Sequence, residues 1–147
     1  MPNSDIEILL IEDNPHEAEL TIRSLKKQQL AGKLMHISDG AEAIDFLLST
    51  DPSSEGLKPV NLKLILLDLK LPKVDGLEIL RKIKEDPRTK MIPVVVLTSS
   101  KEEKDIIESY KLGASSYIVK PVNFESFAKT ISELGLYWMT LNQHPPL

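Results

Sequence analysis

The chain contains short runs of apolar residues, separated by longer stretches in which apolar positions recur with helical spacing. Three runs are almost uninterrupted, at Ile6–Ile11, Leu62–Leu67 and Ile92–Leu97, and a shorter one lies at Tyr117–Val119. A more mixed segment spans Lys33–Ser38. Uninterrupted apolar runs of this length are typical of strands that are covered on both faces of a sheet. The pattern predicts five strands, of which the first, third and fourth are the most buried.

Helices are predicted between these strands, because most of the intervening segments open with a capping residue followed three positions later by glutamate. The pairs are Asn14/Glu17, Asp39/Glu42, Asp75/Glu78 and Ser100/Glu103, and Asn123 is placed to cap a fifth helix. Pro15 takes the first position of the first helix, where its missing N–H costs nothing. Gly113 suits a left-handed residue at the end of the fourth helix.

The alternation of strands and helices predicts parallel pairing, right-handed crossovers and helices on both faces of the sheet. The most apolar strands belong in the middle, and the mixed second and short fifth strands belong at the edges. The predicted fold is therefore α/β, a flavodoxin-like doubly wound (βα)5 parallel sheet with strand order 2-1-3-4-5. The longest loop, Thr50–Asn61, is rich in Ser, Pro and Gly. We expect it to be a surface excursion rather than a partner-binding feature.

Length and composition narrow the classes of protein. The 147 residues suit one domain over 1–147, with a core of about 5–140 and a short proline-containing C-terminal tail. A net charge of −4 without a basic run argues against nucleic-acid binding. Cysteine is absent, which excludes disulfides and thiolate metal sites. No apolar stretch approaches the roughly 18 residues of a membrane span, and no basic segment opens the chain. We expect a cytoplasmic protein that binds no membrane.

Each of the apolar runs ends in a polar residue. The first is followed by Glu12 and Asp13, the third by Asp68, the fourth by Thr98 and the fifth by Lys120. Ligands of open α/β sheets bind beyond the carboxyl ends of the strands, which lie about 4.8 Å apart. We therefore expect the three acids to lie together, with Thr98 beside Asp68. The long side chain of Lys120 can reach back toward Asp68 from two strands away.

This combination of groups suits phosphoryl transfer to a carboxylate. Clustered carboxylates favour a hard divalent cation such as Mg²⁺, which leaves positions for phosphate oxygens. Asp68 would be the nucleophile, Lys120 a point charge on a phosphoryl oxygen and the Thr98 hydroxyl a hydrogen-bond donor. Taken singly, each residue has an ordinary interpretation as a helix cap, a strand residue or a solvated lysine. The prediction depends on their coincidence at neighbouring strand ends.

The same residues lie in stretches that resemble the receiver domain of two-component response regulators, over about residues 5–140. The stretches are ILLIEDNP around Asp13, LILLDLKLPKVDGLEIL around Asp68, IPVVVLTSS around Thr98 and GASSYIVKPVNFESF around Lys120. The spacings of 30 residues from Asp68 to Thr98 and 52 from Asp68 to Lys120 also agree with that family. Through DFLL and SYKLGASSYIVKPVN, the chain is similar to stand-alone regulators of bacterial phytochrome-type kinases.

The resemblance implies a phosphorelay protein that accepts a phosphoryl group on Asp68 from a phosphohistidine of a sensor histidine kinase. It implies a Mg²⁺ ion, or Mn²⁺ in its place, held by Asp13, by Asp68, by the backbone carbonyl of Lys70 and, through water, by Glu12. Self-phosphorylation and slow autodephosphorylation would be its only chemistry, and it would not be an enzyme for an external substrate. Its output would be binding of a downstream protein or onward transfer of the phosphoryl group.

The resemblance also assigns a conformational switch. Thr98 and Tyr117 are similar to the family's switch pair, in which the hydroxyl moves to the phosphoryl group and the aromatic ring turns inward. Lys120-Pro121 matches a peptide bond that is usually cis in the family. Phosphorylation adds up to two negative charges, which favours the state in which Lys120 and Thr98 lie closer to Asp68.

Three other functions remain as alternatives. A Mg²⁺-dependent phosphohydrolase with an aspartyl nucleophile would want a second acid two residues after Asp68, where Lys70 stands. A flavin-binding protein would want a Ser, Thr or Gly phosphate loop after the first strand, where Glu12-Asp13-Asn14-Pro15 stands. A receiver-like scaffold that has lost phosphorylation would not need the complete set of acids, hydroxyl and lysine.

Two features carry further hypotheses. The side chain of Lys70 is expected to lean over the phosphoryl group and hinder the attacking water.

Along the last helix, an apolar stripe is expected to face the core: Phe124, Phe127, Ile131, Leu134, Trp138 and Leu141. Three residues off the stripe suggest a partner surface, such as a homodimer through the fourth and fifth βα elements: Leu136, Tyr137 and Met139. The histidines have no metal-binding spacing and are expected to be ordinary: His16, His36 and His144.

Overall fold

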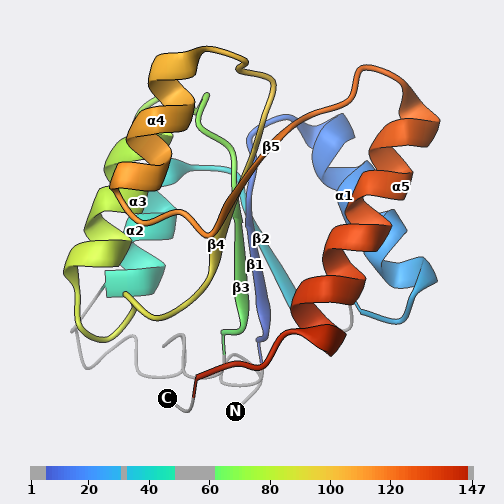
Figure 1. Cartoon of the computed structure of the whole chain (residues 1–147), viewed down its shortest axis with the longest axis horizontal. Coiled ribbons are helices and arrows are strands. Elements are labelled where there is room, and N and C mark those ends of the chain that lie inside the picture. Colours follow the sequence, from blue (N-terminus) through green and yellow to red (C-terminus); the bar gives the residue numbers. More distant parts are fainter. Residues whose placement is uncertain (1–5, 31–32, 49–61, 146–147) are drawn as a thin grey trace.

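The computed structural model describes residues 6–30, 33–48 and 62–145 and has one parallel sheet between two helical layers (Figure 1). The strands are β1 (Ile8–Ile11), β2 (Leu34–Ile37), β3 (Leu64–Leu67), β4 (Val94–Thr98) and β5 (Ser116–Val119). Their order is β2-β1-β3-β4-β5, which confirms the predicted topology. Several strands begin one or two residues later than the apolar runs that predicted them. The Thr50–Asn61 loop lies outside the described residues.

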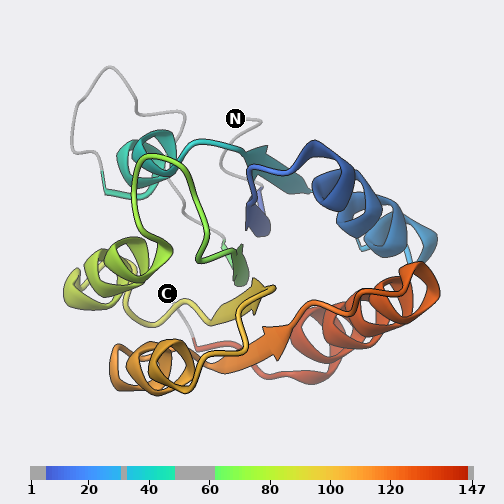
Figure 2. The same ribbon diagram turned by 90° about the horizontal axis from the view of Figure 1, so that it is seen from above.

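In the described segments, five helices cover the two faces of the sheet. They are α1 (Pro15–Lys27), α2 (Gly40–Leu48), α3 (Gly76–Glu85), α4 (Glu103–Lys111) and α5 (Phe124–Leu136), and a short π-helical turn, η3 (Tyr137–Leu141), follows α5. Helices α1 and α5 lie together on one face, and α2, α3 and α4 lie on the other (Figure 2). No helix in the described part of the chain is long and apolar enough to cross a membrane.

Most helix starts follow the predicted capping residues. Asn14 Oδ1 accepts hydrogen bonds from the N–H groups of His16 and Glu17, and Asn123 caps α5 in the same way. The fourth helix is the exception, because α4 begins at Glu103 rather than beside Ser100. The Ser100 hydroxyl instead donates to Asp105 Oδ2 at 2.5 Å, so this side chain closes the loop before α4.

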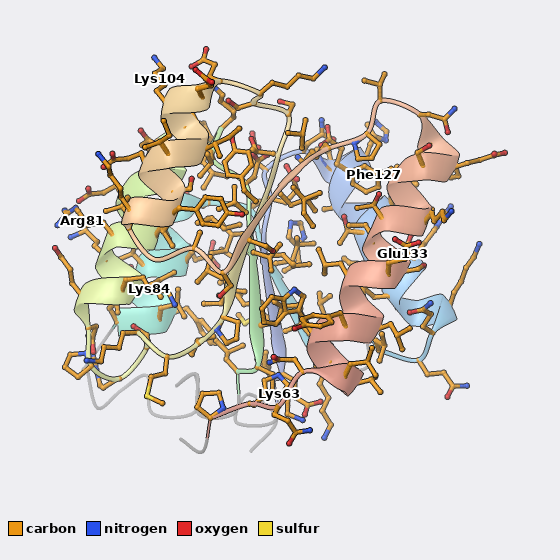
Figure 3. The ribbon with its side chains drawn as sticks, in the orientation of Figure 1. Lys63, Arg81, Lys84, Lys104, Phe127 and Glu133 are labelled. Atoms are coloured by element: carbon orange, nitrogen blue, oxygen red, sulfur yellow. The ribbon has the colours of Figure 1, made fainter. Side chains whose placement is uncertain are left out.

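The core consists of two apolar clusters, one on each face of the sheet. Side chains of the three central strands alternate between the clusters, and those of β1 and β3 are at most 2% exposed. Figure 3 shows side chains filling the space between the sheet and both helical layers. Gly113 adopts the left-handed conformation predicted for it, with φ of +107°. Burial of both strand faces explains why these segments carry continuous apolar runs rather than alternating ones.

The predicted stripe on the last helix is only partly correct. Phe127, Ile131 and Leu134 are buried, but Phe124 and Leu141 are each 61% exposed. Phe124 lies in the first turn of α5, where it lines an open hollow together with Ser99 and Lys120 at the end of the sheet. Beyond Tyr137 the wider π-helical turn changes the angle between successive residues, which takes Leu141 off the stripe.

Candidate functional site

Three carboxylates meet at the carboxyl edge of the sheet, which Figure 2 views from above. Glu12 and Asp13 follow β1, Asp68 follows β3, and Ile11 pairs with Leu67 in the parallel register between these strands. The register brings the acids side by side, and one oxygen from each lies within 4.8 Å of the others. Glu12 and Asp68 are buried, while Asp13 is exposed. The structure confirms that the strand ends gather these acids.

Lys120 carries the positive charge of the site. Its Nζ atom donates hydrogen bonds to Glu12 Oε1 at 2.6 Å and to Asp68 Oδ2 at 2.9 Å. The side chain is only 7% exposed, although it starts two strands away from Asp68. The expected reach of this lysine is therefore confirmed, and the ammonium offsets part of the repulsion between the carboxylates.

Glu17 is a fourth acid of the site, and the sequence did not reveal it. Its Oε1 atom lies 2.5 Å from Lys120 Nζ. The capping-box pattern predicts that Glu17 bonds the N–H of Asn14, but Glu12 Oε2 accepts that hydrogen bond instead, at 3.2 Å. The only signal for this role was the position of Glu17 one helical turn after the acidic pair.

Burial and the opposite charges shift the pKa values of this group. Burial raises the pKa of Glu12 to about 7, against the lowering effect of its hydrogen bond to Lys120. Burial alone would lower the pKa of Lys120, but its close contacts with the Glu12 and Glu17 carboxylates raise that pKa above the ordinary value. The ammonium therefore stays charged at neutral pH, while Glu12 changes its charge close to neutral pH.

The raised pKa of Glu12 predicts that divalent-cation binding depends on pH. Below pH 7 the protonated Glu12 carboxyl loses the charge that attracts the cation, so the apparent affinity for Mn²⁺ should fall as the pH falls through 7. The loss should reach about tenfold per pH unit, the limit for one competing proton. Mn²⁺ titrations at pH 6, 7 and 8 measure this, and Glu12→Gln should flatten the profile. An unchanged affinity across this range would contradict the prediction.

Thr98 and Tyr117 both contact Ser100 in the loop after β4. Thr98 ends β4 fully buried, and its Oγ1 accepts a long hydrogen bond of 3.4 Å from the Ser100 N–H. The Tyr117 hydroxyl donates to the Ser100 carbonyl at 3.0 Å. Burial raises the pKa of Tyr117, which keeps the hydroxyl protonated as a donor. A displacement of this loop would therefore involve both residues of the expected switch pair.

Lys70 and Pro121 were the remaining residues of the predicted site. The backbone N–H of Lys70 donates to Asp68 Oδ1 at 3.1 Å, and its side chain is exposed. The expected cis bond at Lys120-Pro121 is wrong for this structure, because the described residues contain no cis peptide bond. Trans is favoured by about 0.5–1 kcal/mol for such bonds, and the Lys120 ammonium reaches the acids without the cis form.

The histidines lie outside the acidic cluster, as expected. His16 is exposed in α1, and His144 is half-buried in the segment after η3. His36 is exposed on the edge strand β2, but its Nε2 atom lies 2.8 Å from the backbone oxygen of Glu12. This contact ties the edge strand to the chain segment that carries the acidic pair.

The donor set fits a hard divalent cation. The group of Glu12, Asp13 and Asp68 offers only oxygen ligands, which Mg²⁺ and Mn²⁺ prefer, and histidine and cysteine are absent from it. Such an ion would neutralise carboxylate charge that a single ammonium leaves unbalanced. The exposed Asp13 leaves one side of the group open to water and to an incoming anion.

Comparison with known proteins relates the chain to a family of regulatory proteins. The family model described as "Response regulator receiver domain" matches residues 8–132. The chain is 39% identical to "Response regulator Rcp1" of Synechocystis, over 90% of this chain and 88% of that protein. It is 38% identical to "Probable methanogenesis regulatory protein FilR2" of Methanothrix harundinacea, over 94% of this chain and 86% of that protein.

Two solved structures have the same fold over almost their whole length. The phosphorylated cyanobacterial phytochrome response regulator RcpA superposes with a TM-score of 0.87 at 35% identity, covering 96% of this chain and 99% of that one. The Mn²⁺-bound form of Rcp1 gives the same TM-score and coverage at 37% identity. One of these relatives was therefore solved with a phosphoryl group and the other with a divalent cation.

Proposed function

Because the chain belongs to the response regulator receiver domain family of two-component signalling proteins, we propose that Asp68 is its phosphoacceptor. The observation that carries the proposal is the hydrogen bond of 2.9 Å from Lys120 Nζ to Asp68 Oδ2, at the edge where Glu12 and Asp13 also lie. The family implies a histidine kinase or another phosphodonor as the partner. The phosphoryl group would come from a phosphohistidine of such a kinase.

The residues of the site have separate roles in the transfer. One Asp68 carboxylate oxygen attacks phosphorus, the P–N bond of the phosphohistidine breaks, and the electron pair leaves with the imidazole nitrogen, which then takes up a proton. The Lys120 ammonium offsets the charge of the phosphoryl oxygens, and the Thr98 hydroxyl donates a hydrogen bond to one of them. Hydrolysis of the acyl phosphate by water returns the free carboxylate, so the cycle needs no external substrate beyond the phosphodonor.

We propose that Mg²⁺, or Mn²⁺ in its place, is the cofactor. Asp13 and Asp68 would bind it directly, Glu12 through water, and Lys70 through its backbone carbonyl. The bound ion supplies charge neutralisation at the phosphoryl oxygens. The all-oxygen donor group and the Mn²⁺-bound structure of the relative Rcp1 support this assignment.

The phosphoryl group would act on the rest of the protein through Thr98 and Tyr117. Movement of the Thr98 hydroxyl toward the phosphoryl group would break its contact with the Ser100 N–H, and the Tyr117 ring would lose its partner at the Ser100 carbonyl as the loop shifts. The inward turn of Tyr117 would then change the surface formed by α4 and β5. The response would be altered binding of a downstream protein or onward transfer of the phosphoryl group.

The proposal is tested by incubating the protein with acetyl phosphate and Mg²⁺, followed by intact mass measurement. We expect a gain of one phosphoryl group, located by peptide mapping to the segment that contains Asp68. A matched sample with excess chelator should gain none. Steady release of phosphate without a labelled protein would instead indicate the aspartyl phosphohydrolase, and no reaction at all would indicate the phosphorylation-deficient scaffold.

We further propose that the Lys70 side chain slows hydrolysis of the phosphorylated form. Its backbone N–H holds Asp68 Oδ1, so the exposed side chain starts next to the phosphoryl group, where it can obstruct the attacking water. Lys70→Ala should shorten the half-life of the phosphorylated protein by about two- to tenfold, a barrier change of roughly 0.4–1.4 kcal/mol. The control is Lys73→Ala, because Lys73 Nζ lies 3.5 Å from Asp39 Oδ2 and pairs with that residue rather than with Asp68. An equal or longer half-life for Lys70→Ala contradicts the proposal.

For partners, we propose a phytochrome-type sensor kinase and a second copy of this chain, with which it forms a homodimer. RcpA, a phytochrome response regulator, aligns over nearly the whole chain, which supports a similar kinase. The proposed kinase would itself be phosphorylated from ATP, and this also favours a cytoplasmic location for the chain. Apolar side chains exposed on α4, at the end of α5 and in η3 support the dimer surface: Ile107, Tyr110, Leu136, Tyr137 and Leu141. A monomeric elution at high concentration, with and without phosphorylation, would contradict the dimer.

A further inference from the structure

Glu17 contacts the Lys120 ammonium but lies outside the carboxylate group that fits a metal ion. Its Oε1 atom is buried and lies 2.5 Å from Lys120 Nζ. The group of oxygens within 4.8 Å of one another consists of Glu12, Asp13 and Asp68. Lys120 Nζ donates hydrogen bonds to Glu12 and Asp68, and Glu17 is its third charged partner, through an ion pair. Glu17 is thus the partner that Lys120 does not share with the proposed metal ion.

Binding of a divalent cation would create a conflict at the shared acids. Glu12 and Asp68 hold the ammonium at 2.6 and 2.9 Å, and the same two side chains belong to the proposed metal site. A dication and an ammonium on the same carboxylates repel each other strongly in a partly buried site. Without a further acceptor, the ammonium would either leave the site or weaken the binding of the cation.

We propose that Glu17 is a positioning residue, which holds the Lys120 ammonium at the site while a divalent cation binds Glu12, Asp13 and Asp68. Glu17 comes from the first turn of α1, a different element from the strand ends that supply the other acids. Glu17 and Lys120 together line a hollow of about 410 Å³ beside Pro121 and Phe124, which gives the ammonium room to shift on that side. The inference rests on the metal site proposed above.

The test is the affinity for Mn²⁺ of Glu17→Gln, measured by titration at pH 8, where Glu12 is ionised. The variant should bind Mn²⁺ about five- to tenfold more weakly than the parent, within the usual range of coupling between neighbouring sites. Glu19→Gln is the matched control, because it removes the same charge from the same helix. Glu19 is exposed and pairs with Arg23, so this change should alter the affinity by less than about twofold.

Repeating the comparison in the Lys120→Met variant distinguishes positioning of the ammonium by Glu17 from a direct attraction between the Glu17 charge and the cation. In Lys120→Met the competing ammonium is gone, so Mn²⁺ should bind more tightly than to the parent. In that background Glu17→Gln should have no more effect than Glu19→Gln, because there is no ammonium left to hold. A five- to tenfold loss that persists in Lys120→Met, or a parental affinity of Glu17→Gln itself, would overturn the proposal. A parent that binds no Mn²⁺ would overturn the metal site as well, so the two failures are distinguishable.

Discussion

Asp68→Asn is expected to lose phosphoryl uptake from acetyl phosphate completely at the sensitivity of intact mass measurement. The amide oxygen carries no net charge and is a poor nucleophile, whereas the Asp68 side chain offers a carboxylate oxygen and is oriented by hydrogen bonds from Lys120 Nζ and the Lys70 N–H. The rate should fall by at least about 10³-fold, which corresponds to roughly 4 kcal/mol of barrier. No neighbouring group replaces this function, because Glu12 also shares the ammonium and Asp13 lies on the exposed side of the group.

The control for this variant is Asp45→Asn, which makes the same chemical change on the exposed side of α2. It should be phosphorylated like the parent. Asp68→Asn should also remain folded, because Lys120 keeps its contacts with Glu12 and Glu17. Phosphoryl uptake by Asp68→Asn at the parental rate would show that another residue is the acceptor, and a loss in Asp45→Asn would point to a general effect of the substitutions.

The sequence predicted the location of the site because the order and direction of the strands determine which residues lie at the same edge of the sheet. Parallel strands end at one edge of the sheet, and adjacent strands are separated by about 4.8 Å, so residues directly after β1 and β3 must be neighbours. The course of the backbone alone therefore places Asp13 and Asp68 together. Lys120 needed only the additional fact that its side chain is long, and the distance of 2.9 Å to Asp68 confirms it.

The missed features depend on side-chain choices between competing partners. Glu17 could have bonded the N–H of Asn14, as the capping pattern indicates, but the buried ammonium of Lys120 is the stronger attraction in a site with little water. Ser100 could have capped α4, but its hydroxyl donates to Asp105 instead. The sequence pattern indicates which hydrogen-bond and ion-pair partners are available to a side chain. Which of them it contacts depends on the folded structure.

The exposed positions on the last helix were missed for a different reason. Helical periodicity assumes that a continuous partner surface runs along the helix. Phe124 lies beside Lys120 at the end of the sheet, and Leu141 follows a change to π-helical geometry. Both are apolar residues in the expected register that stay exposed at opposite ends of this segment, and exposed apolar side chains are candidate contacts for partners.

Gly76→Ala is expected to destabilise the protein by about 2–4 kcal/mol, because the added methyl group would press on backbone rather than on movable side chains. A Cβ atom at Gly76 would lie 2.5 Å from the Asp68 carbonyl oxygen and 2.5 Å from Leu69 Cα. Gly76 also donates its N–H to the Leu69 carbonyl at 3.1 Å, which fixes the start of α3 against the residue after Asp68. The substitution must therefore move either the helix or the segment that carries Asp68, and Mn²⁺ binding should weaken together with stability.

Urea unfolding at pH 7 and Mn²⁺ titration measure both effects, with Gly135→Ala as the matched control. A Cβ atom at Gly135 would meet the side-chain ends Leu25 Cδ2 at 2.6 Å and Leu30 Cδ1 at 3.1 Å, which can rotate away. Alanine is also favoured over glycine by about 1 kcal/mol inside a helix, so Gly135→Ala should change the free energy of unfolding by less than about 1 kcal/mol and leave Mn²⁺ binding unaltered. If Gly76→Ala proved as stable as Gly135→Ala, the close packing of α3 on the segment after β3 would not constrain the site, and the position of Asp68 would have to be set by Lys120 and the neighbouring acids alone.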